Sequence, residues 1–62
     1  MILSRQDAEA RLNRLRARHH KSARDGSRMV FYVASMKQYV VIDGVGGNMV
    51  RWSISASCPA CK

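Results

Sequence analysis

The order of apolar and polar positions divides the chain into a helical first third and a strand-rich remainder. From Ser4 to about His20 there is no glycine or proline, and alanine, leucine, arginine, glutamine and glutamate dominate, all of which are strong helix formers. Ser4 is a good N-cap, and Asp7, three residues later, completes a capping-box pattern. One helical face follows the i, i+4, i+7, i+11 spacing. It consists of Ala8, Leu12, Leu15 and His19.

After this helix the pattern changes to β-branched and aromatic runs, which are typical of strands. The runs lie at residues 28–34, 39–43 and 49–56. Turn residues separate the elements at 24–27, 35–38 and 44–48. The glycines and the asparagine of the last segment supply the positive φ angles that a hairpin loop needs. The third run alternates most cleanly, so that Val50, Trp52 and Ile54 share one face.

These elements predict an α+β fold in which one N-terminal helix packs on a three-stranded antiparallel β-meander, in the order α-β-β-β. We expect Leu12 and Leu15 to pack against the face that carries Trp52 and Ile54. The sequence predicts a single small domain at 1–57, followed by a cysteine-containing tail at 58–62, in a chain too short for a large core. No internal repeat or linker is evident.

The first two predicted strands are apolar on both faces, whereas one helix can cover only one face of a sheet. We therefore expect the second face to be exposed, self-associated or covered by a partner. This makes a homodimer through the exposed sheet face one prediction for the oligomeric state.

The charge of the chain is the feature that most strongly indicates a function. The chain has 11 lysines and arginines against 4 acids, a net charge of +7 and an isoelectric point near 10.5. No acid falls between Ala10 and Arg24, so ion pairs within this segment are scarce and the charge indicates a negatively charged partner. The guanidinium group of arginine donates two parallel hydrogen bonds to the oxygens of a phosphate or a carboxylate. The candidate binding residues are Arg11, Arg14, Arg18, Lys21, Arg24, Arg28, Lys37 and Arg51.

Two further features are weaker signals for nucleic acid or phosphate. The aromatic residues are about what a small core needs, but Tyr39 opens a strand near Lys37 and is the candidate for stacking on a base. The segment 44–48 is rich in glycine, yet it lacks the Gly-Lys-Ser/Thr ending and the following helix of a phosphate-binding loop. We interpret it as a hairpin loop.

Cys58 and Cys61 have the C-x-x-C spacing that binds zinc or forms a redox-active dithiol. A complete zinc site needs four ligands, and only His19 and His20 are available to add to the pair. Adjacent helical positions point ~100° apart, so both histidines are not expected on one ion. Three interpretations of the two cysteines stay open. They belong to a frayed tail, they bind zinc, or they form a disulfide or redox pair.

The sequence also indicates what this protein is not expected to be. The chain offers no triad, no carboxylate pair and no nucleophile beside a base, so we predict that it is not an enzyme and has no cofactor apart from the zinc considered above. No apolar run approaches the ~20 residues of a membrane span, and the N-terminus does not resemble a secretory signal. We expect a cytoplasmic protein without a membrane partner.

The sequence thus predicts a small, basic, non-enzymatic binding module that contacts a polyanion, above all nucleic acid, DNA or RNA, with weak sequence specificity. The alternative is an inhibitor of the kind that phages and mobile elements encode, such as an anti-CRISPR protein or another host-takeover factor. Such a protein works by covering an acidic surface on a host protein complex.

Overall fold

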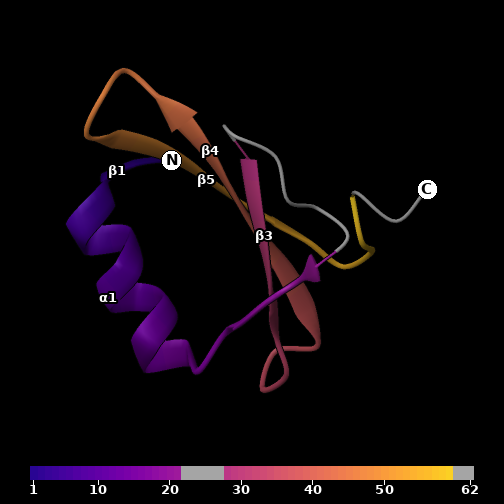
Figure 1. Cartoon of the computed structure of the whole chain (residues 1–62). Coiled ribbons are helices and arrows are strands. Elements are labelled where there is room, and N and C mark those ends of the chain that lie inside the picture. The colour runs from indigo at the N-terminus through magenta and orange to yellow at the C-terminus, as the bar shows by residue number, and fades with distance from the viewer. Residues whose placement is uncertain (22–27, 60–62) are drawn as a thin grey trace.

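In the computed structural model, which describes residues 1–21 and 28–59, one helix lies against one face of an antiparallel sheet (Figure 1). The elements in chain order are β1 (Ile2–Ser4), α1 (Arg5–Leu15), β2 (Arg18–His19), β3 (Arg28–Val33), β4 (Gln38–Val45) and β5 (Met49–Ser55). The five strands lie side by side in the order β1-β5-β4-β3-β2. The predicted α+β class is therefore confirmed.

The predicted three-stranded meander forms the centre of this sheet as β3, β4 and β5, but the three-strand count and the α-β-β-β order are wrong. Two short strands extend the sheet at its edges. β1 pairs with β5, and the Trp52 N–H donates to the Met1 carbonyl at 2.9 Å. β2 pairs with β3, with Arg18 opposite Tyr32 and His19 opposite Phe31. Strands of two or three residues are too short to produce an alternating pattern.

The helix begins as predicted and ends earlier than predicted. The Asp7 N–H donates to the Ser4 hydroxyl oxygen at 3.2 Å, which confirms Ser4 as the N-cap. The helix ends at Leu15 because Arg16 adopts a left-handed conformation, with φ 54° and ψ 47°. With α1 only 11 residues long, no helix in the described part of the chain could cross a membrane.

The hydrogen bonds after Leu15 form a Schellman motif. The Arg16 N–H donates to the Asn13 carbonyl at 3.2 Å, and the Ala17 N–H donates to the Leu12 carbonyl at 3.1 Å. A left-handed arginine costs about 1–2 kcal/mol relative to a helical one. Pairing of β2 with β3 offsets this, since it supplies new backbone hydrogen bonds. His19 therefore leaves the helix, and its predicted place on the helical face is wrong.

The main core lies between α1 and the sheet. Its buried side chains are Ala8, Leu12, Val33, Val40, Ile42, Val50 and Trp52. Leu15 packs against this cluster half-buried, so the predicted contact between the helix and the Trp52 face is confirmed. Ile54 was expected in the same core, but it is 49% exposed because it borders an open groove beyond the end of the packed region.

The second face of the sheet, directed away from α1, contains buried apolar side chains. Val30 is 0% exposed and Val41 is 5% exposed, and Tyr39 packs against both. The expectation of an exposed second face is therefore wrong at its centre, where the chain buries its own apolar residues. A homodimer through the rest of this face stays a prediction.

The hairpin loop predicted at 44–48 is shorter in the structure, since Gly44 and Val45 belong to β4, and its asparagine, Asn48, does not have the predicted positive φ. In the β4–β5 turn Gly46 and Gly47 have φ of 56° and 69°, which glycine adopts without a steric penalty. The Arg5 N–H donates to the Asn48 carbonyl at 2.7 Å, so this turn also holds the start of α1. In the β3–β4 turn, at residues 34–37, the positive φ of 53° falls on Lys37.

We expect Leu12→Ala to lower the free energy of unfolding by about 2–5 kcal/mol, because it removes a buried side chain between α1 and Trp52. Asn13→Ala is the matched control, since Asn13 is the exposed neighbour on the same helix, and it should change stability by less than ~0.5 kcal/mol. Urea unfolding followed by circular dichroism measures both. Equal losses for the two variants would contradict this packing.

Candidate polyanion-binding groove

An open groove lies where the end of α1 meets the edge of the sheet, with a volume of about 540 Å³. Its lining residues are Arg14, Leu15, Arg16, Arg18, Tyr32, Ala34 and Ser35. We call this the arginine groove. Its cations come from three successive local structures, namely the last turn of α1, the helix C-cap and β2. The early end of the helix is thus what brings them around one space.

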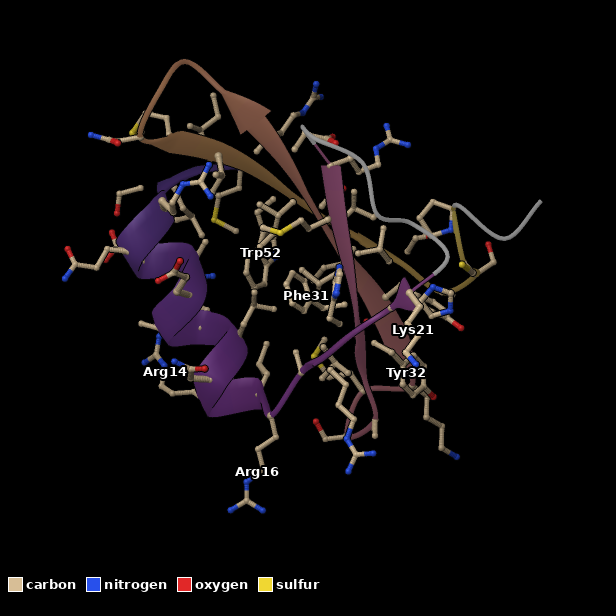
Figure 2. All side chains as sticks on the ribbon, viewed as in Figure 1. Arg14, Arg16, Lys21, Phe31, Tyr32 and Trp52 are labelled. Atoms are coloured by element: carbon tan, nitrogen blue, oxygen red, sulfur yellow. The ribbon has the colours of Figure 1, made fainter. Side chains whose placement is uncertain are left out.

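Each arginine is positioned by its own local structure. Arg14 lies in the last turn of α1, where a cation interacts favourably with the negative end of the helix dipole. Arg16 projects from the end of the helix, away from the core around Trp52 (Figure 2). Arg18 is the cross-strand neighbour of Tyr32, so both side chains lie on the second face of the sheet. The groove therefore spans the helix end and the sheet edge.

The acids of the described residues lie away from this groove. Asp7 and Glu9 are in the first half of α1. Asp43 is opposite Arg28 in the sheet, and its carboxylate accepts from the Arg28 guanidinium at 2.9 Å. Arg28 stands four residues before Tyr32 on β3, a distance of about 13 Å along the strand. No described acid lines the groove, so its cations lack neutralising partners there.

The other predicted binding residues that the structure describes do not line this groove. The Arg11 guanidinium carbon lies 6.0 Å from the Trp52 ring centroid, a cation–π contact in which arginine covers the core. Arg28 is engaged with Asp43. Arg51 is also opposite Asp43, on the second face, and is exposed.

The remaining predicted cations are dispersed. Lys21 is exposed just after β2, well apart from Arg14 and Arg16 (Figure 2). Lys37 is exposed in the β3–β4 turn. Arg24, together with the turn predicted at 24–27, lies outside the described residues. The predicted stripe of arginines along one long helix is therefore replaced by a cluster at the helix end.

Two residues of the groove were missed by sequence reasoning. Arg16 was placed inside a longer helix, and no glycine or proline marked its position as the end. Tyr32 was assigned to the core, whereas Tyr39 was the stacking candidate. In the structure Tyr39 contacts Tyr32 at 5.0 Å and His20 at 5.2 Å between ring centroids. Tyr32 is the tyrosine that lines the groove.

The histidines diverge, as expected, although through strand pairing rather than through a helix. The His19 ring lies 5.3 Å from that of Phe31, whereas the His20 ring is next to Cys58. Cys58 is disulfide-bonded, and Cys61 lies outside the described residues. Within residues 1–21 and 28–59 no three metal-binding side chains come together. The zinc site at Cys58 and Cys61 stays a prediction.

Comparison with known proteins gives no further guide to this groove. The chain matches no protein-family model, no curated protein and no solved structure. The chemistry of the groove is therefore the basis for inferring a function.

The left-handed conformation of Arg16 leads to a prediction for stability. Glycine adopts this conformation freely, whereas alanine retains the Cβ that causes the strain. We expect Arg16→Gly to be about 1 kcal/mol more stable than Arg16→Ala, measured by urea unfolding at high salt to suppress charge effects. If the two variants unfold at the same urea concentration, the helix does not end in this way.

Proposed function

We propose that this protein is a non-enzymatic module that binds the phosphate backbone of nucleic acid in the arginine groove, with little sequence preference. The observation that carries the proposal is the gathering of Arg14, Arg16 and Arg18 around one open groove with no acid among its described lining residues. Nearby cations repel one another, and phosphates relieve that repulsion.

The chemistry of the lining residues fits a polyanion better than an isolated small anion. Three arginines line one open groove, so that each guanidinium group can bind a different phosphate of a chain. Tyr32 adds an aromatic surface on which a base can stack. Few of the described lining residues can distinguish base edges, since Ser35 and Tyr32 are the only polar ones among them besides the arginines. Affinity should therefore depend strongly on salt and weakly on sequence.

The backbone at Arg16 gives separate support. Strained conformations persist where the surrounding structure holds them, and they gather at functional positions. Glycine is the usual residue at the end of a Schellman motif, yet this chain has an arginine there. The side chain that glycine lacks is the one that lines the groove.

The test replaces two groove arginines with neutral residues of similar length, in the double variant Arg14→Gln/Arg18→Gln. Charge-assisted hydrogen bonds contribute about 1.5 kcal/mol or more each, so we expect the loss of two of them to lower the affinity for single-stranded RNA or DNA by roughly 100-fold or more. The slope of log affinity against log salt should become shallower by about 0.7 per lost phosphate contact. Fluorescence anisotropy across a salt series measures both quantities.

The matched control is Arg5→Gln/Arg51→Gln, which removes the same charge at two exposed positions outside the groove lining. It should retain most of the affinity, because only general attraction is reduced. Equal losses in the two double variants would contradict a defined groove. So would the absence of salt-dependent binding to single-stranded or duplex oligonucleotides by the wild-type protein.

A second candidate function is the protein-binding inhibitor that acts on an acidic surface, and a different groove favours it. This groove has a volume of about 350 Å³ and lies between α1 and β5. Its lining residues are Met1, Arg11, Arg14, Leu15, Met36, Trp52 and Ile54. Met1, Met36 and Ile54 are among the exposed large apolar residues. Flexible methionines beside arginines suit an acidic protein segment with apolar anchors.

Nuclease treatment distinguishes the two candidates. For the inhibitor function, we expect affinity capture from a host lysate to retain a stoichiometric protein partner after nuclease digestion. Ile54→Ser should release that partner, because it removes an exposed apolar contact without a change in charge. If digestion removes all captured protein, or if Ile54→Ser captures as much as wild type, this second function is wrong.

A further inference from the structure

Two tyrosines lie side by side on the second face of the sheet. Tyr32 on β3 is directly opposite Tyr39 on β4, and their ring centroids are 5.0 Å apart at an interplanar angle of 57°. We call them the tyrosine pair. In Figure 2 Phe31 lies between α1 and the sheet, whereas its neighbour Tyr32 is directed away from α1. Both tyrosines are half-buried, so each keeps surface that a ligand can contact.

The tyrosine pair is held in one arrangement by its neighbours. Tyr39 packs against the buried side chains of Val30 and Val41, and the His20 ring meets the Tyr39 ring edge-on, at 5.2 Å between centroids. His20 is itself fixed to the sheet, since its backbone N–H donates to the Val30 carbonyl at 2.7 Å. Rings that are already ordered lose little conformational entropy when a ligand binds. The tyrosine pair is therefore a preorganised surface.

The next strand leaves room beside this surface. On the second face β5 places Ser55 opposite Tyr39 and Ser53 opposite Val41, and both serine side chains are much shorter than tyrosine. The Ser55 hydroxyl donates to the Ser57 carbonyl at 2.8 Å, so it is engaged within its own segment. No large side chain of β5 therefore stands next to Tyr39.

The tyrosine pair is continuous with the arginine groove. Tyr32 belongs to both, because it also lines the groove, and its neighbour on β2 is Arg18. The opposite end of the second face attracts phosphates less, since Asp43 lies there and its carboxylate accepts from Arg28 at 2.9 Å. A strand whose phosphates lie in the groove can therefore place its bases on the tyrosine pair.

Cations beside aromatic rings bind unpaired nucleotides, since the cations hold the phosphates while the bases stack on the rings. In a duplex each base is stacked between its neighbours and must leave the stack before a protein ring can contact its face. We propose that the arginine groove and the tyrosine pair together select single-stranded over duplex nucleic acid, by stacking an unpaired base on the tyrosine pair. This selection rests on the proposed function and adds to it the class of strand that is bound.

The experiment measures the affinity of the full chain for three DNA ligands by fluorescence anisotropy, at one near-physiological salt concentration. They are oligothymidylate, a strand of the same length with an abasic site in place of every base, and oligothymidylate annealed to its complement. The abasic strand keeps all the phosphates and offers no base. A stacked base contributes roughly 5- to 150-fold in affinity. We therefore expect oligothymidylate to bind at least about fivefold more tightly than either of the other ligands.

Variants of the two tyrosines identify the surface that the base contacts. Tyr39→Leu keeps an apolar side chain without an aromatic face, whereas Tyr39→Phe, the matched control, keeps the ring. Tyr39→Leu should lower the affinity for oligothymidylate by about fivefold or more and leave the affinity for the abasic strand unchanged. Tyr39→Phe should bind both ligands as wild type does. The corresponding variants of Tyr32 are tested in the same way, and circular dichroism shows which variants are folded.

The comparison of ligands on the wild-type protein tests the proposal even where a leucine variant does not fold. The proposal is overturned if wild type binds the abasic strand or the duplex as tightly as oligothymidylate. It is also overturned if the folded leucine variants bind oligothymidylate as their phenylalanine controls do. Either result leaves phosphate binding intact, because salt-dependent binding of the abasic strand reports the groove alone. Absence of binding to all three ligands would instead contradict the proposed function, and this selection with it.

Discussion

The backbone of Arg16 is the constraint on which the rest of this small structure depends. Its left-handed conformation ends α1 after 11 residues and sends the chain back to the sheet, where Arg18 and His19 pair with β3. A helix that continued would leave these residues on its surface. The short return strand places Arg18 next to Tyr32 and directs His20 to the second face. The arginine groove and the contact between His20 and Cys58 therefore have a common origin.

The binding surface and the core share elements, as expected when a chain is too short to separate them. Leu15 packs against the core cluster and also lines the arginine groove. Arg11 covers Trp52 and also lines the second groove, between α1 and β5. A ligand in the arginine groove contacts the end of α1, β2 and the start of the β3–β4 turn together. Such a ligand would stabilise the fold by an amount that rises with the logarithm of its concentration, once that concentration exceeds its dissociation constant.

Sequence reasoning found the parts of this structure that long local patterns specify. The Ser4 cap, the alternation around Trp52 and the glycines at 46 and 47 each indicated an element that the structure contains. The failures lie where tertiary pairing decides. β1 and β2 are too short to show a period, and the helix end at Arg16 carries an arginine where glycine is usual.

The residues of the candidate site could be predicted from the sequence in part, but their arrangement could not. Composition indicated a polyanion-binding surface, and Arg14 and Arg18 were among the predicted residues that line the groove. Their relation to one another, however, depended on the end of the helix. Arg28 was assigned to binding because a sequence does not show that Asp43 lies opposite it, 15 positions away. Ion pairs between strands follow from register, which local patterns define poorly.

The shortness of β1 and β2 has a consequence for how this protein behaves among its own copies. They are the outermost strands, with three and two residues, and β2 carries Arg18. An outer strand with many free amide and carbonyl groups is a template on which other chains can add and grow into fibrils. These two offer very few such groups, and like charges keep approaching copies apart. The same arginine that lines the groove thereby helps to protect the sheet against aggregation.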